Sequence, residues 1–318
     1  MSGKVYFLPW NKKNEFYKFL KFARAFDHVK ARQFVAIKMH FGEDGNEGYV
    51  KPEYTKVLTD IAKEKTAFPF LTDASTIYVG KRSDAYHHLL LANKHGFNIN
   101  NCGCPVIISD GLRGNAAAEV EINKKHFKTV SVARDIYYTD SFIFLNHFKG
   151  HEIAGFGGAL KNIGMGCGSK AGKYAMHHNT NPEVDTTNCI GCGECTISCP
   201  KGVFELSWDD SLKNVQEKIV EVCYGVLKNK KSFSISFLNH ITKYCDCNTR
   251  RDKVLLDDIG IVAGADPVAV DKASIDIVNK IYGKDFIKHL YPDIDYMVQL
   301  NYAQELGIGS KEYTLIQY

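Results

Sequence analysis

The sequence has no long hydrophobic run and only a small excess of charge of one sign. No uninterrupted apolar stretch approaches the roughly 18 residues that a transmembrane helix needs, so we expect no membrane segment. The first residues, Met1 to Val5, do not lead from a charged stretch into a long apolar one. We therefore expect no signal peptide and a cytoplasmic location. A formal net charge of +4 does not predict nucleic-acid binding, for which a clustered basic face is expected.

The composition is that of an ordinary globular protein, except for the distribution of its cysteines. Of 318 residues, 45% are apolar, 24% charged and 12% aromatic, enough for one large domain or two modest ones. Ten cysteines in a chain without an export signal predict reduced thiols rather than a disulfide framework. Six of them are clustered, as the run Cys189, Cys192, Cys195 and Cys199 and the pair Cys245 and Cys247.

Hydrophobic periodicity predicts strands that alternate with helices along most of the chain. The expected strands are 5–8, 35–39, 68–72, 106–109, 142–145, 233–238 and 259–262, and the expected helices are 15–26, 52–65, 84–95, 212–228 and 267–280. This alternation favours an α/β fold with a mostly parallel sheet flanked by helices. We expect one α/β domain, residues 1–180 and 212–318, interrupted by a small ferredoxin-like cysteine-rich insert at 181–211.

The clustered cysteines have the C-x2-C-x2-C-x3-C-P spacing of bacterial ferredoxins, ending at Pro200. Three thiolates two residues apart can surround one face of a [4Fe–4S] cubane, and Gly191 and Gly193 let the backbone approach its sulfides. Zinc is the alternative, but zinc sites usually separate their paired cysteines by a longer spacer. The motif therefore predicts an iron–sulfur cluster.

Two complete sets of cysteine ligands for the cluster fit the sequence. In two-cluster ferredoxins the cysteine before proline binds the other cluster. One solution is a single cluster on Cys189, Cys192 and Cys195, completed by Cys167, Cys245 or Cys247. The other adds a second metal centre on Cys199 with those three remote thiols. Cys102, Cys104 and Cys223 are interpreted as buried core thiols.

Polar residues follow several of the expected strands, where ligands bind in open α/β sheets. They are His40, Asp73, Asp110, Asn146 with His147 and His151, and Asp266. If these strands share an edge, the residues surround a pocket. The alternative is that Asp110 and Asp266 cap turns or helices and that the histidines are structural.

The segment 155–173 is rich in glycine and carries Lys161, Lys170 and Lys173. It lacks the spacing of a Walker or a Rossmann loop, and Gly155 occupies the position of the second histidine of a zinc protease. We interpret it as a flexible loop suited to an anionic ligand or to supporting the cluster, with a lysine-bearing surface loop as the alternative.

Several of these stretches together resemble a known family. They are 38–52, 110–114, 147–173, the ferredoxin run, 245–247 and 258–271. The sequence is similar to domain-of-unknown-function family 362, which comprises iron–sulfur proteins of anaerobes. Family members commonly carry two ferredoxin runs, whereas this chain has one. The segment from His151 to Lys161 also superficially resembles lactate racemase-type proteins.

We consider three functions. The first is electron transfer through one [4Fe–4S] cluster, with two possible, to or from a ligand or partner at the carboxyl edge of the sheet. This function would make the protein an oxidoreductase that docks an acidic carrier such as a ferredoxin or flavodoxin. The second is a non-redox enzyme, racemase- or lyase-like, with His40, His151, Lys161 and Asp110 as catalytic groups and the cluster as a structural element or Lewis acid. The third is a metal-binding scaffold without turnover.

Overall fold

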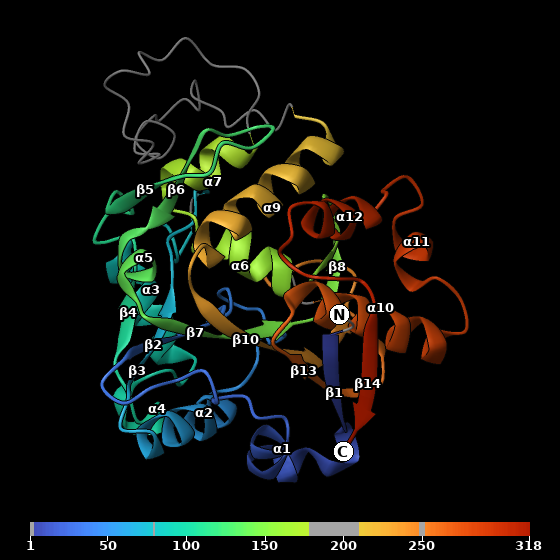
Figure 1. Ribbon diagram of the computed structural model, residues 1–318, viewed down its shortest axis with the longest axis horizontal. Coiled ribbons are helices and arrows are strands. Elements are labelled where there is room, and N and C mark those ends of the chain that lie inside the picture. Colours follow the sequence, from blue (N-terminus) through green and yellow to red (C-terminus); the bar gives the residue numbers. More distant parts are fainter. Residues whose placement is uncertain (1–2, 79, 178–209, 248–251) are drawn as a thin grey trace.

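A computed structural model describes residues 3–78, 80–177, 210–247 and 252–318. Its centre is an eight-stranded sheet in the order β14-β1-β13-β10-β7-β2-β3-β4 (Figure 1). The strands are β1 (Gly3–Pro9), β2 (Phe34–Lys38), β3 (Phe68–Asp73), β4 (Val106–Ile108), β7 (Ser141–His147), β10 (Lys231–Leu238), β13 (Gly260–Gly264) and β14 (Tyr313–Gln317). In this sheet only β13 runs against the other strands. The predicted α/β class and the mostly parallel sheet are confirmed.

Helices cover both faces of the sheet. Figure 1 shows α6, α9, α10 and α12 over one face, and α1, α2 and α4 over the other. The helices are α1 (Phe16–Phe22), α2 (Pro52–Glu64), α3 (Ala85–Lys94), α4 (Ile99–Cys102), α5 (Arg134–Tyr138), α6 (Ala159–Cys167), α7 (Lys170–His177), α9 (Leu212–Leu227), α10 (Pro267–Tyr282), α11 (Phe286–Leu290) and α12 (Met297–Glu305), with the 3-10 helix η1 (Trp10–Glu15). The small strands are β5 (Ala117–Glu121), β6 (Thr129–Ala133), β8 (Lys149–His151), β9 (Gly155–Gly157), β11 (Ile241–Thr242) and β12 (Val254–Leu256), which pair as three hairpins.

Alternation along the strands divides the interior into two hydrophobic cores. In β7, Phe142 and Phe144 join the core under α6, α9 and α10, whereas Ile143 and Leu145 join the core with α1 and α2. Successive side chains of a strand point to opposite faces, so a central strand covered on both sides is apolar throughout. This is why β7, buried along its whole length, was predicted as an uninterrupted apolar run.

The direction of β13 corrects one prediction. The chain returns from β10 to β13 through the β11–β12 hairpin, without a helical crossover in the described part of that connection, and so enters the sheet antiparallel. The carboxyl end of β13 therefore lies at the opposite edge from the carboxyl ends of the parallel strands. Asp266 does not face the predicted pocket; its side chain accepts from Val268 N and Ala269 N at the start of α10.

The glycine-rich segment is also not the flexible loop that we predicted. It forms α6 and α7, and both Lys170 and Lys173 are buried. Its glycines allow close packing: a Cβ on Gly164 would overlap the carbonyl oxygen of Ile219 in α9, and one on Gly172 would overlap that of Ser131. Glycine was therefore a sign of helix packing rather than of a loop.

The predicted insert at 181–211 falls almost entirely outside the described residues, as do Cys189, Cys192, Cys195 and Cys199. The insert and its cluster stay predictions. In the part of the chain that the structure covers, no helix has both the length and the apolar character to cross a membrane.

Candidate functional site

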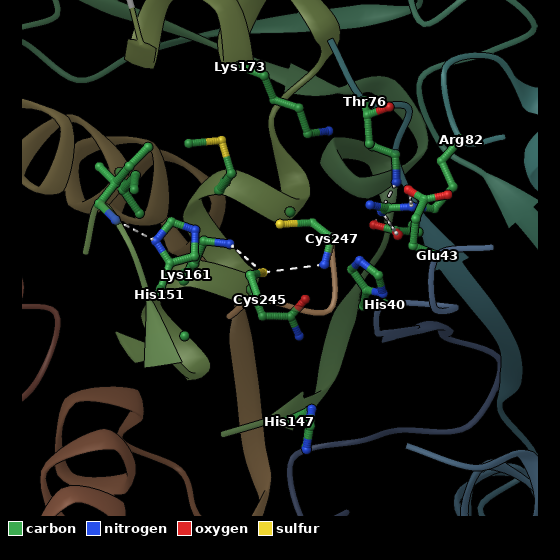
Figure 2. A pocket seen from close by; sticks show the side chains of 18 of the residues that line it. His40, Glu43, Thr76, Arg82, His147, His151, Lys161, Lys173, Cys245 and Cys247 are labelled. Carbon is green, nitrogen blue, oxygen red and sulfur yellow. Dashed lines mark hydrogen bonds and ion pairs between the residues drawn. The ribbon is translucent and has the colours of Figure 1, made fainter. Parts of the chain in front are cut away.

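A cavity of about 600 Å³ lies at the carboxyl edge of the parallel strands (Figure 2). The ends of β2, β3 and β7 reach it with Lys38, Asp73 and His147, and the loop after β2 adds His40. Helices α6 and α7 and the loop after β11 complete the wall. This edge of the sheet is the place where ligands bind in open α/β folds.

His151, Cys245 and Cys247 form the part of the cavity wall suited to a metal. One potential ligand atom from each lies within 4.8 Å of the others. Cys245 and His151 are buried, and Cys247 is partly exposed. The two cysteine sulfurs at this spacing fit a thiophilic metal such as zinc or iron, and the His151 ring lies beside them.

Two positively polarised groups stabilise the sulfur of Cys245 as a thiolate. Lys161 Nζ donates to Cys245 Sγ over 3.3 Å, and the His151 ring also hydrogen-bonds to this sulfur. The bond from the Cys247 thiol, the charge of Lys161 and the hydrogen bond from His151 hold the pKa of Cys245 well below its ordinary value, while the bond between the two cysteines and burial raise the pKa of Cys247. Cys245 is therefore the thiolate of the pair and Cys247 is the thiol.

The His151 ring has a defined tautomer. Its Nδ1 accepts from Ile153 N at 3.2 Å and from Ala154 N at 3.1 Å. Burial lowers the pKa of this ring, so it is neutral and carries its proton on Nε2. The Nε2–H is then available to donate to Cys245 Sγ.

Asp246, between the two cysteines, holds their segment against the sheet. It is buried and contacts His147 Nδ1 at 2.8 Å and Lys149 Nζ at 2.7 Å. Although burial opposes it, these two charges hold the pKa of Asp246 below its ordinary value. The Nε2 of His147 lies 2.7 Å from the carbonyl oxygen of Asn239. This contact network places the thiols over the carboxyl end of β7.

A second group of buried charges forms another wall. Lys38 Nζ contacts Asp73 at 2.9 Å and Arg82 Nε contacts Glu43 at 2.9 Å. Arg82 also hydrogen-bonds to Tyr78, whose hydroxyl donates to the carbonyl oxygen of Cys247 at 3.3 Å. Arg82 thus connects these acids to the cysteine segment.

His40 and Lys173 also line the cavity. His40 Nδ1 accepts from Gly42 N at 2.8 Å, and burial followed by the charge of Arg82 lowers its pKa well below the ordinary value. The ring is therefore neutral, with a hydrogen on Nε2. Burial lowers the pKa of Lys173 to about 8.

Of the seven predicted catalytic and cysteine residues that the structure describes, five lie together and two do not. His40, His151, Lys161, Cys245 and Cys247 line the one cavity. Asp110 is not among the lining residues; its buried carboxylate accepts from the backbone and hydroxyl of Ser75 at 3.0 Å. Cys167 lies in the hydrophobic core, apart from the Cys245–Cys247 group, and burial raises its pKa to about 12. The catalytic and ligand roles of all these residues stay predictions.

The sequence reasoning did not identify Lys38, Arg82, Lys149 or Asp246. Lys38 had a detectable signal, since a lysine in the otherwise apolar stretch 35–39 must find a buried partner. Arg82 and Asp246 had none, because their partners are distant in the sequence.

One protein-family model matches most of the chain. The model of the family described as Domain of unknown function (DUF362) matches residues 35–276. The chain belongs to this family. The matched range includes the strands and helices that contribute the cavity wall.

Among the solved structures similar to this DUF362 protein are two with low sequence identity. A protein from Thermotoga maritima is 14% identical, with a TM-score of 0.48 over 86% of this chain and 58% of its own. The lactate racemase apoprotein from Thermoanaerobacterium thermosaccharolyticum is 12% identical, with a TM-score of 0.41 over 76% of this chain and 51% of its own. The chain thus spans between half and three fifths of the length of these two proteins. No curated protein is similar enough in sequence to count as a relative.

Proposed function

We propose that this DUF362 protein transfers single electrons through a [4Fe–4S] cluster, to or from a ligand in the cavity beside Cys245 and Cys247. The supporting observation is the Cys245 thiolate, which is held by Lys161 and His151 at the wall of that cavity. A cluster of this type, when bound, supplies one electron at a time. The ferredoxin run from Cys189 to Cys199 supplies the sequence evidence for it.

In this proposal Cys245 and Cys247 either complete the cluster of the ferredoxin run or hold a second metal. Lys161 and His151 donate to the Cys245 sulfur and offset its negative charge. Hydrogen bonds to a ligand sulfur raise the reduction potential of the metal that it binds.

We further propose that the reaction takes place in the cytoplasm, where thiols stay reduced, and that the electrons come from or go to an acidic carrier such as a ferredoxin or flavodoxin. A slightly basic chain suits such a partner, because opposite charges accelerate encounter.

An anaerobic redox titration tests the proposal. Protein purified or reconstituted without oxygen should contain iron and acid-labile sulfide in stoichiometric amounts and show a reversible one-electron couple by EPR. The double substitution Cys245→Ser and Cys247→Ser should change the EPR spectrum or the iron content, since it removes thiolate ligands. Cys104→Ser is the matched control, because Cys104 is buried beside Thr59 and does not line the cavity. Stoichiometric zinc without iron would contradict the proposal.

A non-redox enzyme is the second candidate, and His40 favours it. Its neutral ring lines the cavity with Nε2 as a proton-bearing atom, as in sites where an uncharged imidazole polarises a substrate oxygen. A cluster that cannot be reduced or oxidised, in a protein that incorporates deuterium from D2O into a bound organic acid, would favour this candidate over electron transfer.

A further inference from the structure

Lys173 is a buried ammonium without a carboxylate partner among the described residues. The side chain is 6% exposed, and its Nζ donates to the carbonyl oxygen of Gly168 at 2.8 Å. Asp110 and Asp73 act on it electrostatically, yet neither forms an ion pair with it. Burying an unpaired ammonium is costly, so such a group usually has a partner that is present in the functional state.

The other cations of the cavity wall already have anionic partners. Lys38 is paired with Asp73, Arg82 with Glu43, and Lys149 with Asp246. Lys161 donates to the Cys245 sulfur. Lys173 is therefore the cation of the described cavity wall whose charge no described side chain balances. An anion that enters the cavity can pair with it.

The rest of the wall includes a substantial apolar part. Figure 2 shows the Lys173 side chain extending into the cavity, on the side away from His147. The larger apolar side chains of the lining belong to Ile77, Leu145, Ile153, Met165, Val215 and Ile219. Free phosphate or a small inorganic anion would leave these side chains uncovered, whereas a molecule with an apolar body would remove them from water.

We propose that the cavity binds an organic carboxylate with an apolar chain or ring, with its carboxylate on the Lys173 ammonium and its apolar body on the aliphatic side chains that line the same cavity. As a substrate class this rests on the function proposed above, because the bound acid would lie beside Cys245 and Cys247. Binding itself requires only the protein.

Calorimetric titration of the full-length, metal-free protein with acetate, butanoate and hexanoate tests the ligand class. Affinity should rise about fourfold for each added methylene, the change expected when a methylene leaves water. Hexanamide has the same apolar body without the charge, and it should bind at least tenfold more weakly than hexanoate. Equal affinity for the amide and the acid, or for acetate and hexanoate, would overturn the inference. Both comparisons use the unmodified protein, so they do not depend on how a variant folds.

Substitution of Lys173 tests the anchor. Lys173→Met should weaken hexanoate binding at least tenfold and leave hexanamide binding unchanged, whereas Lys173→Arg should keep most of the affinity. Lys13→Met, at an exposed position on η1, is the control for loss of a lysine charge. It should change neither hexanoate binding nor hexanamide binding. Thermal melting of each variant checks folding. Unchanged hexanoate binding by folded Lys173→Met protein would place the carboxylate elsewhere and overturn the inference.

Metal binding is measured separately on the same preparations, which keeps the two proposals distinguishable. Hexanoate binding by a protein that takes up no iron would refute the electron-transfer proposal and support this site. Iron uptake with a reversible one-electron couple, but no hexanoate binding, would support the electron-transfer proposal and refute the carboxylate site.

Discussion

At the scale of single residues, His151 differs from the usual metal-bound histidine. A ligating imidazole normally donates its second N–H to a carboxylate, carbonyl or water. His151 Nδ1 instead accepts two backbone N–H groups. The proton of the neutral ring is thereby kept on Nε2, the atom that faces the Cys245 sulfur. The hydrogen bonds indicate a donor to a thiolate ligand rather than a ligand itself.

We therefore expect His151→Gln to keep stoichiometric metal binding with about tenfold weaker affinity, the usual cost of losing a residue that supports a ligand. Cys245→Ser should abolish stoichiometric binding. Titration with Co²⁺, followed through the sulfur-to-cobalt charge-transfer band, measures both. X-ray absorption of the cobalt-loaded wild-type protein should show sulfur and no imidazole scattering. An imidazole signal that disappears in His151→Gln would contradict this assignment.

At the scale of elements, α6 depends on a carboxylate from another helix. Asp271 in α10 is fully buried and accepts from Ala159 N at 2.6 Å and Leu160 N at 2.9 Å, at the first turn of α6. A Cβ on Gly158 would overlap this carboxylate, so glycine is needed there. The contact joins α10 to the helix that carries Lys161, and thus connects the core to the cavity wall.

Asp271 also predicts a pH dependence of stability. Burial raises its pKa to about 7, whereas in the unfolded chain the carboxyl titrates near its ordinary value of about 4. Between these values the folded state holds the proton and the unfolded state does not. The contribution of Asp271 to the free energy of unfolding therefore falls as pH rises, by about 1.4 kcal/mol per pH unit, and levels off above pH 7.

The measurement is urea unfolding of the wild type and Asp271→Asn across this pH range. The difference in unfolding free energy between the two should decrease from about pH 4 to about pH 7 and then stay constant. Asp293→Asn, at an exposed position, should give a curve parallel to the wild type. A parallel curve for Asp271→Asn would show that the carboxyl is already ionised in the folded protein throughout this range.

At the scale of the whole molecule, the sheet gathers at one edge side chains that are far apart in the sequence. Lys38 and Cys245 are separated by more than 200 residues, and both line the same cavity. The chain as a whole has a formal net charge of +4. A modest positive charge favours an acidic partner through interactions that mobile ions screen.

The proposed docking of an acidic ferredoxin or flavodoxin should therefore weaken with salt. Raising the ionic strength from about 0.01 M to about 0.15 M shortens the Debye length from about 30 Å to about 8 Å. The dissociation constant, measured by surface plasmon resonance, should increase several-fold over this range. An unchanged constant would indicate apolar docking, and a neutral carrier variant provides the control.

Sequence patterns predicted the regular elements well, because apolar periodicity reports how each segment is buried. The strand at 142–145 and the helix at 52–65 appear in the structure within a few residues as β7 and α2. The pattern was misleading in segment 155–173, where glycine reflects the close approach of α6 to α9. For the cavity, the sequence indicated His40, His151, Lys161 and the Cys245–Cys247 pair, but not Arg82 or Asp246.

The sequence by itself determined the α/β class, the strands that end in polar residues and the thiols available for a metal, since these follow from local periodicity and residue chemistry. Only the tertiary structure decided the direction of β13, the removal of Asp266 from the site and the burial of Cys167 in the core. It also decided which cations are neutralised, and left Lys173 without a carboxylate among the described side chains. These outcomes depend on which distant segments come into contact, and local patterns carry no information about such contacts.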